Sequence, residues 1–164
     1  MDGMADVKTT AIMYDLTAAM QDAVAALDAY QAAIRTRISE TLAPEGRIDR
    51  AALDLHQHMA HGFAWVTTYV ETLRETANWA CRLEQEGQFG EIEALLSQIL
   101  FGEYCAQMRG GIPMTQGGVT RPADLGLTDA DLSLLSHAGI ERFVREGKTQ
   151  ASLAAAATHL PDSL

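Results

Sequence analysis

The chain has 164 residues, the size of one ordinary domain, of which 48% are hydrophobic and 21% are charged. This composition excludes a disordered chain, which would have too little apolar surface to fold. Twelve Lys and Arg against 22 Asp and Glu give a net charge of -10, so we expect neither a nucleic acid nor an anionic membrane as a partner.

No apolar run reaches the length of about 18 residues that a membrane span needs, and the first twenty residues lack the basic start of a signal peptide. Cys81 and Cys105 lie inside helical patterns, which favours buried thiols over a disulfide framework. Both observations predict a cytoplasmic protein.

The first predicted element is an Ala-rich helix over residues 5–42, preceded by a disordered start at residues 1–4. Proline and glycine in the sequence Ala43-Pro44-Glu45-Gly46 end it, because the residue before a proline avoids the helical conformation. Its apolar residues recur at steps of three or four, as on one helix face: Ile12, Leu16, Ala19, Ala23, Leu27, Tyr30, Ile34 and Ile38.

A second, longer helix is predicted from the N-cap Asp49 to Glu86. It carries two neighbouring apolar stripes, so it needs partners on two sides. Gly62 is either its weak point or a place where a neighbouring helix comes close. One stripe contains Met59, Phe63, Val66, Val70, Leu73, Ala77 and Ala80, and the other contains Trp65, Tyr69, Thr72, Thr76, Trp79 and Leu83.

Gly87 is the expected C-terminal cap, and a third helix follows over residues 89–108. The three helices are expected to form a core over residues 5–108. The predicted buried face of the third helix contains Ile92, Leu95, Leu96, Ile99, Leu100, Tyr104 and Met108.

Residues 109–127 are rich in Gly and Pro and have no apolar period, which predicts a long loop. Residues 128–164 are expected to form short helices and a tail. Thr128 opens a capping box, residues 140–145 form a further helix ended by Gly147, and residues 150–159 fray. No segment alternates apolar and polar residues with a period of two, so no strand is predicted. The fold class is therefore all-α, an elongated bundle of three main helices with short C-terminal helices.

Metal binding and catalysis find little support in the sequence. His56, His58 and His61 lie close to Asp54, but on a helix His56 points away from His58. No Glu-x-x-His pair occurs, and neither an activated serine nor a Cys-His pair is visible. We therefore nominate no catalytic, cofactor-binding or metal-binding residue.

Two surfaces remain as candidates for docking a partner. The aromatic residues Trp65, Tyr69 and Trp79 could stack on a flavin or an adenine, but aromatic residues at helical spacing are more often core or interface anchors. The glycine-rich loop is neither a P-loop nor a dinucleotide fingerprint, although its flanking arginines could contact an anionic group. Its candidate residues are Arg109, Gly110, Gly111, Pro113, Gln116 and Arg121.

Several short motifs carry a resemblance to a known family. They are His61-Gly-Phe-Ala-Trp65, Gly87-Gln-Phe-Gly-Glu91, Gly102-Glu-Tyr104, Gly110-Gly-Ile-Pro-Met-Thr-Gln116 and Arg121-Pro-Ala-Asp-Leu-Gly126. In these motifs the chain resembles the N-terminal helical extension of the methylsuccinyl-CoA dehydrogenases. These are flavin-dependent members of the acyl-CoA dehydrogenase family, used in the ethylmalonyl-CoA pathway.

The resemblance implies an accessory, non-catalytic module. In that family FAD and the acyl-CoA are held by a later catalytic module, whose motifs have no match in this chain. We therefore expect no cofactor bound by the chain itself and a docked catalytic module as its partner. The alternative is a stand-alone homodimeric scaffold without an enzyme partner, in which the same aromatic stripe forms the seam.

Overall fold

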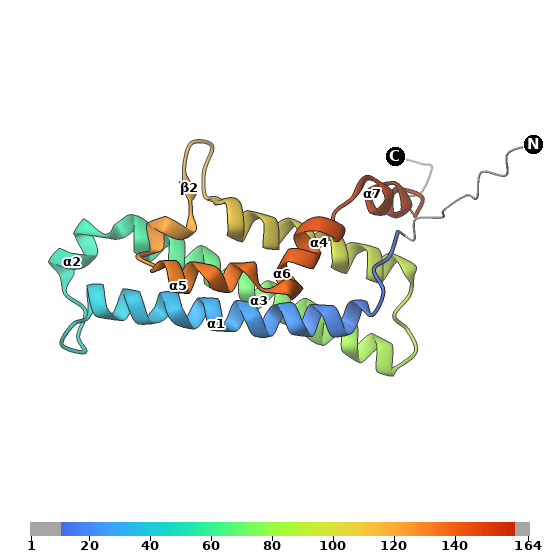
Figure 1. The fold of residues 1–164 in the computed structure, drawn as a ribbon, viewed down its shortest axis with the longest axis horizontal. Helices are drawn as coiled ribbons and strands as arrows, with labels where there is room; N and C mark the ends of the chain where they lie inside the picture. The colour runs from blue at the N-terminus through green and yellow to red at the C-terminus, as the bar shows by residue number, and fades with distance from the viewer. Residues whose placement is uncertain (1–10, 160–164) are drawn as a thin grey trace, which may run out of the picture.

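Three long helices run along the longest axis of the molecule, as predicted (Figure 1). The structure is a computed structural model that describes residues 11–159. The helices are α1 (Leu16–Leu42), α3 (Gln57–Gln85) and α4 (Glu91–Gly110). The predicted all-α, elongated bundle is confirmed, whereas the expected disordered start and the end of the tail lie outside the described residues.

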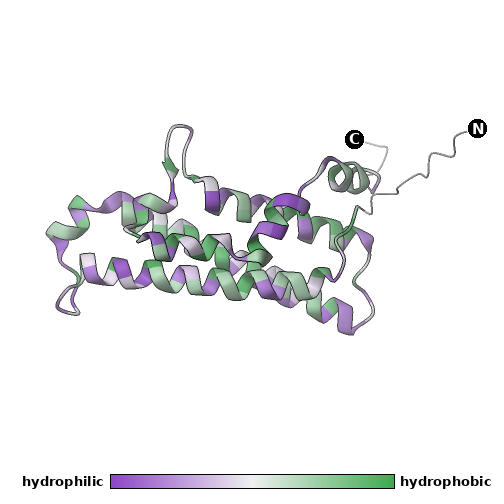
Figure 2. Cartoon of the chain, viewed as in Figure 1, coloured by the Kyte–Doolittle hydropathy of each residue, from purple (hydrophilic) through white to green (hydrophobic). Residues whose placement is uncertain are grey.

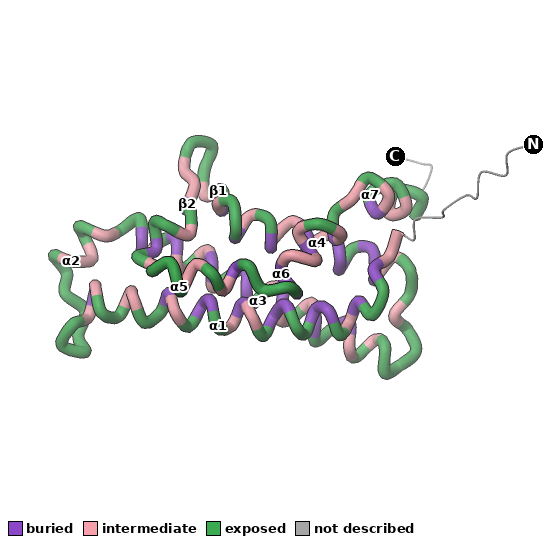
Figure 3. Tube along the Cα trace, viewed as in Figure 1, coloured by how far each residue is buried: buried purple, intermediate pink, exposed green. Residues whose placement is uncertain are grey.

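The other elements are short. They are α2 (Arg50–Leu55), β1 (Ile112–Pro113), β2 (Val119–Thr120), η1 (Pro122–Leu125), α5 (Asp129–Leu132), η2 (Ser133–Ser136), α6 (Ala138–Glu146) and α7 (Gln150–Ala157). Buried residues lie along the inner sides of the long helices, whereas α2 and the tip of the hairpin contain none (Figure 3). No helix among residues 11–159 is both long enough and apolar enough to cross a bilayer.

Helix α1 buries the predicted face. Figure 2 shows hydrophobic and hydrophilic segments alternating along it, as expected of a helix with one buried side. The helix begins at Leu16, so residues 11–15 precede it. Ile12 and Ile38 are half-buried, and the rest of the predicted stripe is buried: Leu16, Ala19, Ala23, Leu27, Tyr30 and Ile34.

The second predicted helix is divided into α2 and α3 at His56, which has a non-helical backbone (φ -113°, ψ 30°). Asp49 caps α2 as predicted, accepting hydrogen bonds from the backbone N–H groups of Ala51 and Ala52 at 2.9 and 3.4 Å. Gly62 does not break the helix. A Cβ atom there would lie 2.5 Å from Cγ2 of Thr120, so close approach explains it, although the neighbour is β2 rather than a helix.

Helix α4 is rotated relative to the prediction. Leu96 was expected in the core but is 55% exposed, and Ile92, Ile99, Leu100 and Tyr104 are only half-buried. The reason is the small Gly102, where a Cβ atom would lie 2.5 Å from the backbone nitrogen of Lys148. The chain at the end of α6 packs closely there, which turns another face inward: Ala94, Leu95, Ser97, Gln98, Phe101, Gly102, Cys105 and Met108.

The core also extends beyond the three long helices. Ile140 and Phe143 of α6 are fully buried, and the rings of Phe143 and Phe101 are 4.8 Å apart. The predicted capping box at Thr128 and the predicted end of α6 at Gly147 are both confirmed.

The predictions for residues 109–127 and 150–159 need correction. Residues 112–113 and 119–120 form a small antiparallel ladder in which Ile112 pairs with Thr120. A period of two cannot be recognised in two-residue strands, which is why none was predicted. Residues 150–157 were expected to fray but form α7, because Thr149 caps the helix and the fully buried Ser152 donates a hydrogen bond to the carbonyl of Gly147 at 3.3 Å.

Candidate interaction surfaces

The side chain of Tyr69, a residue of α3, is buried against α4. Only 7% of its surface is exposed, and its ring stacks on that of Tyr104 at a centroid distance of 4.0 Å. Its hydroxyl donates a hydrogen bond to Oε1 of Gln107 at 2.5 Å. Burial, and secondarily the nearby Tyr104 and Glu103, raises the pKa of Tyr69. Tyr69 therefore fastens α3 to α4 and presents little surface to a partner.

The two tryptophans lie on either side of Tyr69 along α3. Trp65 is half-buried, contacts Tyr69 edge to face, and donates a hydrogen bond from Nε1 to Nε2 of His61 at 3.1 Å. Trp79 is 37% exposed. Of the three predicted docking aromatics, Trp79 thus offers the largest accessible ring.

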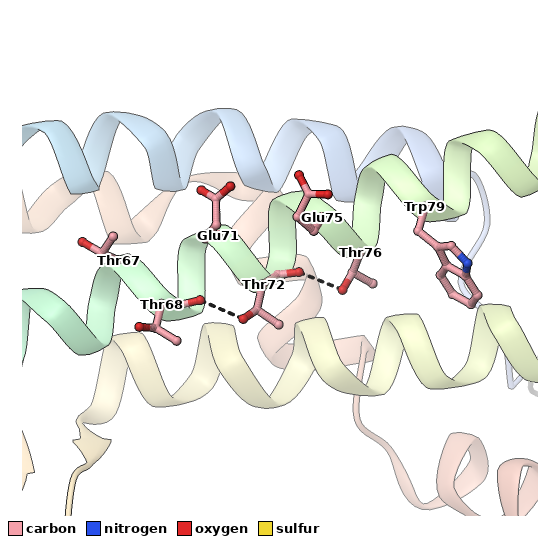
Figure 4. Close-up of a pocket in the computed structure, with 7 residues that line it drawn as sticks. All are labelled: Thr67, Thr68, Glu71, Thr72, Glu75, Thr76 and Trp79. Atoms are coloured by element: carbon pink, nitrogen blue, oxygen red, sulfur yellow. Dashed lines mark hydrogen bonds between the residues drawn. The ribbon is translucent and has the colours of Figure 1, made fainter.

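Trp79 forms one end of a shallow groove of about 740 Å³ on the surface of α3, which we call the threonine groove. Figure 4 shows Thr68, Thr72, Thr76 and Trp79 on the side of α3 that faces α4. The residues that line the groove are Thr67, Thr68, Glu71, Thr72, Glu75, Thr76 and Trp79.

Three of the four threonine hydroxyls of this groove are occupied by the helix itself, whereas the buried hydroxyl of Thr67 has no hydrogen-bond partner among the described residues. Thr68, Thr72 and Thr76 each donate a hydrogen bond to the carbonyl oxygen four residues earlier, at 2.8 to 2.9 Å. With the donors engaged, the methyl groups are left for contact with a partner. The surface is therefore more apolar than its composition indicates.

Helix α4 carries a second apolar row, which is not part of the groove lining. Leu96, Leu100 and Tyr104 are spaced four residues apart and so share one face of the helix. Because Tyr104 stacks on Tyr69, this row follows the side of α4 next to α3. Leu96 is its exposed end.

The opposite edge of the groove is acidic. Glu71 and Glu75 point towards α1 in Figure 4, and Glu71 forms an ion pair with Arg74, which also pairs with Asp28 of α1. No basic residue lines the groove. An apolar segment with Lys or Arg along one side would complement this surface.

The predicted loop residues fall into two groups. Arg109, Gly110 and Arg121 come together around a second pocket, of about 370 Å³. Pro113 lies in β1, and Gln116 is exposed at the tip of the hairpin, so neither lines that pocket. We call it the arginine pocket; its lining residues are Arg109, Gly110, Arg121, Pro122, Ala123, Leu132, Leu135 and Ser136.

Gly111 lies between the end of α4, which carries Arg109, and the side chain of Arg121. Its φ of +132° strongly favours glycine, and a Cβ atom would lie 2.5 Å from Cγ1 of Val119 and 3.4 Å from Cγ of Arg121. Glycine at this position therefore lets β2, which ends just before Arg121, return beside α4. Leu132, Leu135 and Ser136 also line the pocket but were not predicted from the sequence, because no local signal connects them with residue 109.

The histidines are scattered over different contacts. Nε2 of His58 lies 3.6 Å from Oδ2 of Asp124, and His61 accepts the hydrogen bond from Trp65. Within residues 11–159, no three His, Cys, Asp or Glu side chains are placed to hold a metal ion.

The chain is similar in sequence to part of a known enzyme. It is 41% identical over 145 residues to the (2S)-methylsuccinyl-CoA dehydrogenase of Cereibacter sphaeroides. The match covers 87% of this chain but only 25% of that protein, so the chain spans about a quarter of the length of this relative. No protein-family model matches the chain. The resemblance to part of a methylsuccinyl-CoA dehydrogenase is thereby confirmed.

Proposed function

We propose that this chain is an accessory, non-catalytic helical module that docks onto the catalytic part of a flavin-dependent acyl-CoA dehydrogenase. The observation that carries the proposal is the uneven match, which covers 87% of the chain and 25% of the relative. In that relative, the region similar to this chain is joined to a larger remainder. The bound FAD and the methylsuccinyl-CoA chemistry of the ethylmalonyl-CoA pathway are assigned to the partner.

The threonine groove supports a docking role. It combines an exposed Trp79 with a row of threonine methyl groups, and large aromatic residues are frequent anchors at interfaces. The proposed occupant is an apolar helix of the catalytic module with basic residues facing Glu71 and Glu75. The net charge of -10 also favours a basic partner surface.

The same proposal includes the cellular compartment of the protein. Cys81 and Cys105 are both free thiols, which is typical of proteins in a reducing environment. We place the chain and its partner in the cytoplasm.

Affinity capture from a native cell extract tests the docking. The purified chain serves as bait, the captured proteins are identified by mass spectrometry, and the eluate is scanned for flavin absorbance. We expect an acyl-CoA dehydrogenase that contains flavin. Trp79→Ala should weaken the purified pair at least about tenfold, as expected of an interface anchor. Tyr14→Ala removes an aromatic side chain that is 81% exposed and lies outside the groove, and should bind like the wild type.

Two results would contradict the proposal. One is capture without any flavoprotein, combined with a dimer of the chain whose dissociation depends on Trp79; this result would support the homodimeric scaffold instead. The other is equal binding of the flavoprotein by the wild type and by Trp79→Ala, which would remove the threonine groove from the interface.

A further inference from the structure

The arginine pocket lies apart from the threonine groove, and the two share no lining residue. It lies between the C-terminal end of α4, the 3-10 helix η1, and the segment formed by α5 and η2. Its volume of about 370 Å³ is at the lower end of the range for small-molecule sites. From its charge and lining we infer that the pocket binds a small molecule with a carboxylate on a short aliphatic stem.

The charge of the pocket is opposite in sign to the net charge of the whole chain. The chain carries a net charge of -10, yet the pocket is lined by two arginines and by no acidic residue. Guanidinium groups can bind a carboxylate through two parallel hydrogen bonds. The C-terminal end of α4 contributes about half of a negative charge at the same place, which two full positive charges exceed.

The guanidinium groups are available for a ligand. Within residues 11–159, no carboxylate forms an ion pair with the Arg121 side chain. Arg109 lies 3.7 Å from Oε1 of Glu141, and both side chains are more than one third exposed. Such exposed pairs contribute little, so a ligand can compete for Arg109. The neighbouring Asp124 carboxylate instead accepts a hydrogen bond from the backbone N–H of Arg121 at 2.7 Å.

The hairpin holds the two arginines at the same pocket. Ile112 pairs with Thr120 in the ladder, and continuing this antiparallel register places Arg121 beside Gly111. The short distance of 3.4 Å between the position that a Cβ atom of residue 111 would take and Cγ of Arg121 agrees with this register. Arg109 belongs to the last turn of α4, just before Gly111. Two arginines that are 12 positions apart in the sequence therefore line one site.

The rest of the lining selects an aliphatic stem. Leu135 is buried, Leu132 and Pro122 are half-buried, and Ala123 adds a methyl group. Ser136 contributes one neutral hydroxyl. A hydrated inorganic anion would leave these apolar surfaces without contact, whereas a short hydrocarbon chain would cover them.

A titration of the purified full-length chain followed by NMR tests the inference. The probe is methylsuccinate, with the amides of Gly110 and Ala123 as reporters and that of Thr72 in the threonine groove as the reference. We expect saturable one-to-one binding with a Kd of about 1 mM or tighter, with shifts at Gly110 and Ala123 only. Arg121→Gln should weaken binding at least about tenfold. Arg82→Gln, which removes the same charge from an exposed position of α3, should leave it unchanged.

Three further probes identify the ligand chemistry. The neutral dimethyl ester of methylsuccinate should not bind, and inorganic phosphate should bind at least about tenfold more weakly than methylsuccinate. The α-amide of N-acetylglutamate represents the side chain of a docked protein. It offers one carboxylate to the two arginines where methylsuccinate offers two, so it should also bind more weakly. Equal or tighter binding of phosphate or of the glutamate derivative would overturn the assignment, as would binding of methylsuccinate that Arg121→Gln does not change. The chain is titrated alone, so the result is independent of the proposed docking.

Discussion

At the residue scale, the two cysteines have different surroundings. Cys105 is fully buried in α4, and burial raises the pKa of its thiol to about 12. Cys81 is half-buried, and its sulfur accepts a hydrogen bond from Nε2 of Gln21 at 3.1 Å. Because the thiolate is the nucleophile, a buried thiol with a raised pKa is inert.

We therefore predict that iodoacetamide at about pH 8 modifies only Cys81 in the native protein. Mass spectrometry should show one alkyl group before unfolding in urea and two afterwards. The variant Cys81→Ser should remain unmodified until it unfolds. Alkylation of Cys105 at the rate of Cys81 would show that this part of α4 is open to solvent.

At the element scale, glycines determine how closely the helices pack. Gly102 of α4 faces the backbone of Gly147 and Lys148, at the end of α6. This contact rotates α4 so that Phe101 meets Phe143 in the core while Leu96 remains exposed. The position of the apolar row on α4 next to α3, with Leu96 as its exposed end, is thus a consequence of packing on the opposite side of the helix.

Gly102→Ala should lower the free energy of unfolding by about 1 to 3 kcal/mol, because backbone atoms have to move to make room for the methyl group. Gly110→Ala is the matched control, since no atom lies within 4 Å of the position of its Cβ. This control should leave stability unchanged or raise it by up to about 1 kcal/mol. Urea unfolding followed by circular dichroism measures both, and equal stability of Gly102→Ala and the wild type would refute the close packing.

At the scale of the whole molecule, Gln98 joins three distant parts of the chain. Its fully buried side chain accepts a hydrogen bond from the backbone N–H of Met13 at 2.9 Å. It donates hydrogen bonds to the carbonyls of Ala11 at 2.7 Å and Gly147 at 3.3 Å. The segment before α1 is thereby fixed to α4 and to the end of α6.

Gln98→Ala should lower the free energy of unfolding by about 1 to 3 kcal/mol, because it leaves buried backbone groups without their partner. The Met13 amide should also exchange its hydrogen faster, as measured by NMR. Gln88→Ala removes an exposed glutamine before α4 and should change neither quantity. Unaltered exchange at Met13 in Gln98→Ala would mean that the segment is held by other contacts.

Local signals in the sequence were sufficient for most helices. The stripe of α1, the caps Asp49 and Thr128, and the turn at Gly87 involve residues only a few positions apart. Such signals act within one or two helical turns, so they can be recognised without a partner. The division at His56 and the formation of α7 were not predicted.

The candidate surfaces were predictable only in part. The sequence identified Trp65, Tyr69 and Trp79 as one stripe, and Arg109 and Arg121 as the arginines that flank one loop. It did not show that Tyr104 would cover Tyr69, which lies 35 positions before it. Nor did it show that Leu132 and Leu135 would complete the arginine pocket.

The amino-acid sequence by itself determined the helical class, the three long helices, the caps Asp49 and Thr128 of two short helices, and the turn at Gly87. Periodicity and capping depend on near neighbours. Only the tertiary structure decided which side of α4 is buried, which aromatic ring stays accessible and which residues meet Arg109 and Arg121. These outcomes depend on the fit of side chains from distant segments, with Gly102 against Gly147 as the clearest case.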